Sequence, residues 1–170
     1  PCHAQGFEEH FHQILEWELF LHPEGVAGMR DLMRADMPAA MVTLVFPMLR
    51  RGFARQLHAR GIARHGPEAI AAAGRRDLDA LEALLAERPF ITGAAPDLDD
   101  NAVWGQVAPL LAWPMAAPVA EDAKRRARLA DWARQVHAHV VHGSAEGADQ
   151  RRSAMKPRSS AAASSAPIPS

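Results

Sequence analysis

The chain has 170 residues, of which 48% are hydrophobic, and a formal net charge of −1. That length allows one domain with a buried core. The near-neutral charge excludes a broad electrostatic surface for nucleic acid.

The single cysteine, Cys2, excludes an internal disulfide and favours a reducing compartment, which predicts a cytoplasmic location. No apolar run is long enough to cross a bilayer, so no membrane span is expected. Ala and Leu are prominent and Tyr is absent, a composition that favours helices over sheets.

Apolar residues recur at helical spacing through most of the chain and predict an all-α fold of five to six helices. We expect helices over about residues 7–21, 26–34, 38–57, 67–88, 98–111 and 119–142. Pro47 should kink or split the third helix. Residues 143–170 are rich in Ser, Ala, Pro and Gly and predict a disordered tail. The expected folded domain therefore comprises residues 1–142.

The fifth predicted helix begins with a capping motif. Asp97 can accept hydrogen bonds from the free N–H groups of the first turn, and Asp100 stands where a capping-box side chain reaches back. Both carboxylates suit the positive end of the helix dipole. Trp113 precedes Pro114 and should end the helix.

Two segments resemble a known family. Arg88–Gly105, with its Pro-Phe-Ile-Thr-Gly turn and acidic cap, resembles the capped central helix in the C-terminal domain of glutathione transferases. Arg55–Ile70 and Arg75–Leu81 look like the failed-axon-connections and metaxin-like branch of that family. The family cap is usually Ser or Thr, and here it is Asp97, which caps equally well. The resemblance implies a helical bundle of the glutathione transferase C-terminal type.

The same resemblance implies what the whole protein would do. A thioredoxin-like N-terminal domain would bind glutathione as co-substrate and form its thiolate, and a homodimer is possible. The first helix would face that domain, which makes His10, Ile14 and Trp17 candidates for the pocket of the hydrophobic co-substrate; they could equally be core. No catalytic residue is carried over, because the chain has no Tyr and Cys2 lies in no suitable turn.

Other polar groups have plainer interpretations. His137, His139 and His142 lack the converging ligands of a zinc site, so no metal is predicted. Arg60 and Arg64 either hold an anion at the next helix start or serve the fold, Arg60 capping helix carbonyls and Arg64 pairing with an acid.

Two further sets of charges are expected to face solvent. Arg50, Arg51, Arg55 and Arg60 form a solvated basic stripe, and Glu8, Glu9 and Glu16 cover the outer side of the first helix.

These observations predict the C-terminal helical half of a glutathione transferase-like protein, inactive by itself. The alternative is a non-catalytic helical module for protein interaction, whose docking surface would be an open apolar patch. A metal-binding helical protein is a third option.

Overall fold

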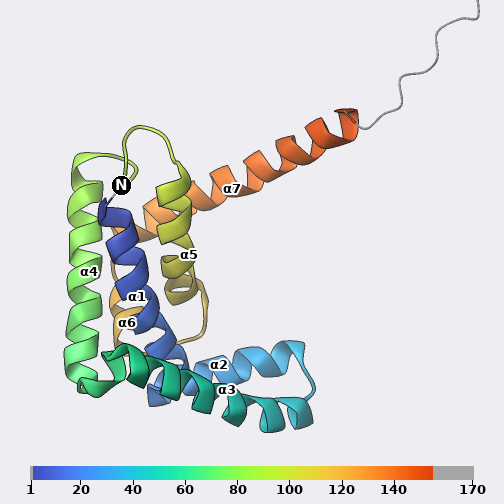
Figure 1. Cartoon of the computed structure of the whole chain (residues 1–170). Helices are drawn as coiled ribbons and strands as arrows, with labels where there is room; N and C mark the ends of the chain where they lie inside the picture. Colours follow the sequence, from blue (N-terminus) through green and yellow to red (C-terminus); the bar gives the residue numbers. More distant parts are fainter. Residues whose placement is uncertain (1, 155–170) are drawn as a thin grey trace, which may run out of the picture.

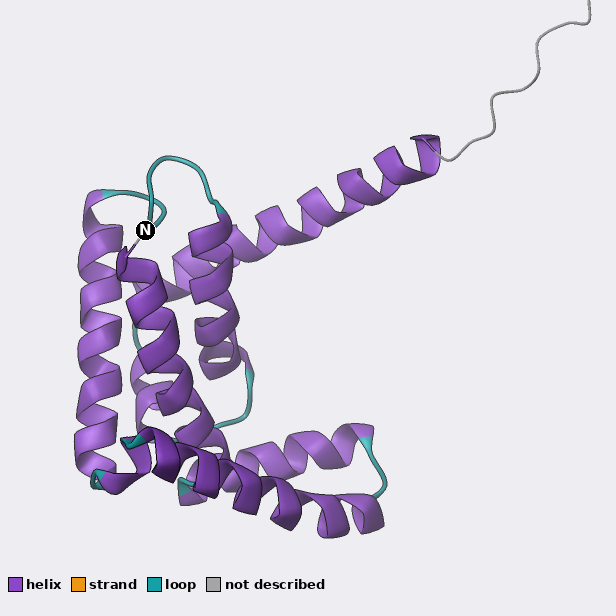
Figure 2. Ribbon diagram, viewed as in Figure 1, coloured by secondary structure: helices purple, strands orange, loops and turns teal. Residues whose placement is uncertain are grey.

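The computed structural model describes residues 2–154, with side chains for residues 9–141. This part of the chain forms helices α1 (Cys2–Phe20), α2 (Pro23–Asp36), α3 (Ala39–Arg60), α4 (Pro67–Glu87), α5 (Leu98–Ala112), α6 (Pro118–Lys124) and α7 (Ala127–Ala154), and a short 3-10 helix, η1 (Ile62–Arg64). Figure 2 shows helices and loops but no strand among the described residues. The all-α prediction is confirmed, whereas the predicted number of helices is too low.

Helix α1 lies at the centre of the bundle and packs against α2, α3, α4 and α5. The pair α2–α3 crosses one end of the bundle and projects outward, while α7 extends away near the other end (Figure 1). Fully buried side chains come from α1, α3, α4, α5, α6 and α7, among them Phe11, Leu57, Leu78, Val107, Val119 and Leu129. One continuous core therefore joins the helices. Whether the bundle is of the glutathione transferase C-terminal type stays a prediction.

Prolines and a glycine set several helix boundaries. Pro23, Pro67 and Pro118 lie in the first turns of α2, α4 and α6, where a missing N–H leaves no hydrogen bond unmade. Gly61 ends α3 with φ of 99°, a left-handed conformation that glycine adopts without steric cost. The chain thus turns sharply from α3 through η1 into α4.

The capping box at the start of α5 is confirmed. The Asp97 carboxylate accepts from the backbone N–H groups of Asp99 (2.9 Å) and Asp100 (3.2 Å), and the Asp100 carboxylate accepts from the N–H of Asp97 (3.3 Å). The Thr92 hydroxyl donates to Asp97 at 2.6 Å and lowers the pKa of that carboxyl group. Helix α5 ends at Ala112 with Trp113 as its extended C-cap, as the following proline predicts.

Asp100 does more than complete the cap. Its side chain is fully buried, and its Oδ1 accepts from the backbone N–H of Ile91 (3.0 Å) and from the indole N–H of Trp132 on α7 (2.8 Å). A buried carboxylate is stable only when donors replace its water shell. One side chain therefore fixes the loop before α5, the start of α5 and the position of α7.

Pro47 does not split α3, which is one of the two effects expected of it; the kink stays a prediction. Helix α3 continues through Pro47 although proline removes one backbone hydrogen bond. Val42 and Phe46 before it and Leu57 after it are buried in the core. Tertiary packing thus holds both halves of α3 in one helix.

The last predicted helix is instead two helices. The chain turns at Arg125 and Arg126, and the Arg126 guanidinium reaches Asp79 (2.7 Å) and Glu82 (3.0 Å) on α4 and Asp122 (2.6 Å) on α6. Partial burial lowers the pKa of Arg126, but the hydrogen bonds and negative charges of Asp79 and Asp122 raise it, and the pKa lies above its ordinary value. This ion-pair cluster ties the α6–α7 junction to α4.

Helix α7 continues to Ala154, and Ala, Glu, Gln and Arg among residues 145–152 favour helix. The disorder of residues 143–170 stays a prediction. The rest of the predicted tail, residues 155–170, lies outside the described residues.

Replacing Asp100 should destabilise the fold strongly. Asp100→Ala leaves the N–H of Ile91 and the indole N–H of Trp132 buried without an acceptor, and we expect a loss of about 3 kcal/mol in the free energy of unfolding. Urea unfolding measures it. Asp99→Ala is the matched control, since that carboxylate accepts no hydrogen bond within the described part of the chain; it should cost under about 1 kcal/mol. Equal losses would contradict the role of Asp100.

Candidate functional sites

The three candidate pocket residues of α1 lie in different surroundings. Ile14 is fully buried and Trp17 is 6% exposed, both in the core. The His10 side chain is 47% exposed, and its Nδ1 lies 2.7 Å from Oδ2 of Asp77 on α4. Of the three, His10 offers an accessible polar group. Their contact with a co-substrate stays a prediction.

A row of polar side chains crosses α1 from α5 to α3. His12 places Nδ1 2.9 Å from Oε1 of Gln106 on α5 and Nε2 3.1 Å from Oε1 of Glu16. The other oxygen of Glu16 accepts from Arg60 on α3 at 3.3 Å. Glu16 does not cover a solvent face as predicted, because its side chain is 11% exposed and paired on both sides.

The row contains a histidine and a carboxylate, as an acid–base pair does, but neither ring nitrogen of the histidine is free to reach a substrate. A histidine oriented by a carboxylate can transfer protons when one ring nitrogen reaches the substrate. In His12 both nitrogens face oxygen atoms of Gln106 and Glu16. No serine, threonine or cysteine contacts the ring in the described contacts. The arrangement therefore links α1, α3 and α5, and it does not form a catalytic triad.

The predicted roles of Arg60 and Arg64 are exchanged in the structure. Arg60 pairs with Glu16, while Arg64 donates from Nε to the backbone carbonyl of His58 at 3.1 Å and so caps the end of α3. Both arginines serve the fold. The predicted solvated stripe of Arg50, Arg51, Arg55 and Arg60 therefore does not hold for all its members, because Arg50 and Arg60 make contacts within the fold. Arg50 donates to the carbonyl of Phe20 at 2.9 Å.

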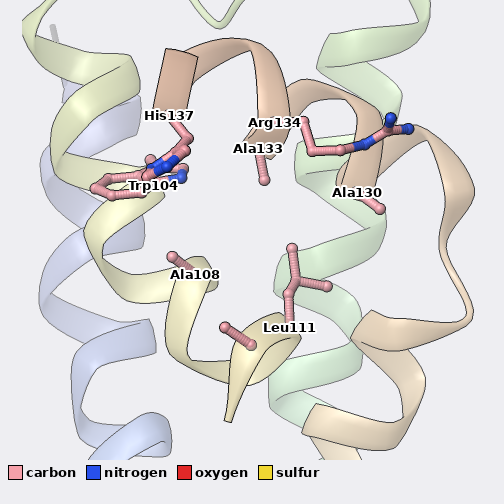
Figure 3. A pocket seen from close by; sticks show the side chains of 8 residues that line it. Trp104, Ala108, Leu111, Ala130, Ala133, Arg134 and His137 are labelled. Atoms are coloured by element: carbon pink, nitrogen blue, oxygen red, sulfur yellow. The ribbon is translucent and has the colours of Figure 1, made fainter. Parts of the chain in front are cut away.

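An open apolar pocket lies between α5 and α7 (Figure 3). It encloses about 360 Å³ and is lined by Trp104, Ala108, Leu111, Ala112, Ala130, Ala133, Arg134 and His137. The rings of Trp104 and His137 lie together at one end, with centroids 5.6 Å apart, and Arg134 stands at the other. Alanines keep the space open. The pocket suits a small apolar or aromatic molecule. Arg134 at its rim is paired with Asp131.

Glu18 on α1 carries a second fully buried carboxylate. Its oxygens accept from the backbone N–H groups of Val119 (2.7 Å) and Ala120 (3.1 Å) at the start of α6. Burial raises the pKa of Glu18 to about 7, although those two hydrogen bonds and the charge of Arg75 oppose the shift. Glu18 supplies the cap that α6 lacks from its own residues.

Metal binding finds no geometric support in the described residues, where no three His, Cys, Asp or Glu side chains are grouped to hold an ion. His137 lies against Trp104, and the side chain of His142 is outside the described set. Among the described helices, none is long and apolar enough to cross a membrane.

Comparison of the chain with protein-family models, curated protein sequences and solved structures finds no significant match. The family resemblance of residues 55–105 therefore stays a prediction.

Sequence reasoning missed the groups that depend on tertiary contacts. The spacing of Trp104, Ala108 and Leu111 places them on one side of α5, and Ala130, Ala133 and His137 do the same on α7. That pattern could have indicated a pair of helix faces with small residues. Nothing in the sequence shows that these two faces oppose each other.

Glu18 predicts a definite pH dependence of stability. Burial raises the pKa of Glu18 in the folded state from 4.5 to about 7. The stability that protonated Glu18 contributes is therefore fully present below the pKa of the unfolded state and is lost as pH rises through the pKa of the folded state. The free energy of unfolding should fall by up to about 3 kcal/mol between about pH 5 and 8.

Glu18→Gln tests this prediction, since glutamine keeps the shape but does not titrate. Urea unfolding of both proteins at several pH values should show the wild type losing stability relative to the variant as pH rises. A constant difference across this range would refute the assignment. Glu9→Gln, at an exposed position on the same helix, is the control and should follow the wild type.

Proposed function

We propose that this chain is the helical half of a glutathione transferase-like protein and that it supplies the binding pocket for a hydrophobic co-substrate. The apolar pocket between α5 and α7 is the observation that supports the proposal most directly. Its alanine lining and the aromatic end at Trp104 fit an aromatic electrophile. The resemblance of residues 55–105 supports the family.

The proposal divides the chemistry between two parts of the full protein. A thioredoxin-like domain would bind glutathione and form the thiolate, since the described contacts of this chain show no nucleophile beside an acid–base group. The sulfur would then attack the electrophile held by the helical half. On α1, His10 does not line this pocket and pairs with Asp77 on α4; it would face the thioredoxin-like domain, with Ile14 and Trp17 in the core behind it.

A homodimer and a cytoplasmic location belong to the same proposal. They rest on the family resemblance and on the single cysteine.

A non-catalytic interaction module is the second candidate. The observation that favours it is a set of large apolar side chains left exposed on α3, where Met41, Leu44 and Met48 have exposed fractions of 49%, 79% and 64%. Exposed apolar groups clustered on one face mark contact surfaces more often than catalytic ones.

The first test is the intact mass of the protein from its native source, followed by assay of that full-length form. We expect the full-length protein to bind glutathione and to conjugate it to a halogenated nitroaromatic compound, and the 170-residue chain to show no turnover. Turnover by the 170-residue chain, or a full-length protein that neither binds glutathione nor conjugates it, would refute the transferase proposal. In the second case the interaction module becomes the leading function.

Filling the pocket should abolish ligand binding without harming the fold. Ala108 lines the pocket on α5, so Ala108→Phe should weaken binding of a fluorescent anilinonaphthalene sulfonate at least about tenfold, a change of about 1.4 kcal/mol. Ligand binding should also quench the fluorescence of Trp104, and Trp104→Phe should remove that change. Ala80→Phe, at an exposed position on α4, is the matched control. Unchanged affinity in Ala108→Phe would place the ligand elsewhere.

A further inference from the structure

Five side chains share the outward face of α3. Met41, Leu44, Met48, Arg51 and Arg55 follow one another at intervals of three and four residues, which places them on one side of a helix. All five are exposed. We call this set the outer stripe. The core contacts of the same helix come from Val42, Phe46 and Leu57, which are buried.

The outer stripe is apolar in its first half and positively charged in its second half. Its first half carries three large apolar side chains, and its second half carries two guanidinium groups. Neither Arg51 nor Arg55 has an ion pair or hydrogen bond among the described contacts, whereas Arg50 and Arg60 are engaged within the fold. Two positive charges on this face are therefore left for an external partner.

The surrounding charge has the same sign. Residues 39–60 include four arginines and no Asp or Glu, and the α2–α3 pair (residues 23–60) carries six arginines against three acids, a net charge of +3. The whole chain has a net charge of −1, which leaves −4 for the remainder. The projecting end of the molecule is thus positive in an otherwise acidic protein, and it suits an anionic partner.

The shape of this face suits a bilayer surface. The α2–α3 pair projects from the bundle (Figure 1), so the outer stripe forms a ridge. A bilayer interface accepts a convex helix, with apolar side chains at the acyl boundary and arginines among the phosphates.

A basic hollow adjoins the ridge. Arg30, Arg34, Val42, Thr43, Phe46 and Pro47 line a space of about 230 Å³ between α2 and α3. Arg30 lies over the ring of Phe46, 5.4 Å from its centroid, and has no ion pair among the described residues. Its charge adds to that of the outer stripe on the same projecting pair of helices.

We propose that the outer stripe of α3 docks this protein on the surface of bilayers that contain anionic lipids. Met41, Leu44 and Met48 enter the interface, and Arg51 and Arg55 contact lipid phosphates. The binding is reversible and peripheral. It is independent of the proposed transferase activity, because the pocket between α5 and α7 shares no residue with the stripe.

Cosedimentation with vesicles tests the proposal, using both the 170-residue chain and the full-length native protein. Both should bind vesicles of phosphatidylcholine mixed with phosphatidylglycerol, bind phosphatidylcholine alone much more weakly, and lose affinity as salt rises. Leu44→Glu should abolish binding. The double variant Arg51→Gln, Arg55→Gln should bind about thirtyfold more weakly, as expected for two arginines near an anionic surface.

Two matched controls separate the stripe from general surface changes. Leu98→Glu alters a leucine that is 83% exposed on α5, and the pair Arg76→Gln, Arg128→Gln removes the same charge from exposed positions on α4 and α7. Both controls should bind mixed vesicles nearly as the wild type does.

Several outcomes would overturn the proposal. One is equal binding by Leu44→Glu and Leu98→Glu, and another is equal loss in the two arginine pairs. A full-length protein that ignores vesicles while the 170-residue chain binds them would mean that another part of the protein covers the stripe. Chains that ignore vesicles but self-associate in sedimentation, with association lost in Leu44→Glu, would assign the stripe to a protein contact instead.

Discussion

The buried carboxylate of Asp100 is the constraint on which the arrangement of α5 and α7 depends. Its two oxygens accept hydrogen bonds from a loop amide, a cap amide and the indole of Trp132. The indole of Trp132 lies far in the sequence from the two amides, and losing Asp100 would leave it and the N–H of Ile91 buried without an acceptor. This side chain therefore ties α7 to the start of α5, the two helices that line the apolar pocket.

Glu18 plays the corresponding part at the start of α6. That helix has only seven residues and no side-chain cap of its own, so it could not hold its position through local interactions. Glu18 on the central helix binds its first amides, and close contact with α4 completes the arrangement, since a Cβ at Gly74 would lie 2.7 Å from Val119. The short helix is thus fixed by its neighbours.

The features that the sequence predicted are local ones. The capping box of Asp97 and Asp100, the prolines that begin helices and the turn at Gly61 depend on residues within a few positions of each other. What the sequence could not predict depends on distant partners. No proline or glycine marks the break between α6 and α7, where Arg126 pairs with acids on α4. The burial of Glu16 likewise requires Arg60, 44 residues away.

The distribution of charge connects the pocket and the ridge to one orientation of the molecule. Helix α4 begins beside the end of α3 and runs away from it (Figure 1), and four of its five acids, at positions 77, 79, 82 and 87, lie in its distant half. Two of these acids, Asp79 and Glu82, pair with Arg126, whereas Arg51 and Arg55 on the ridge have no partner among the described contacts. An anionic surface would therefore attract the ridge. The pocket between α5 and α7 shares no side chain with the ridge, so docking would leave it open to ligand.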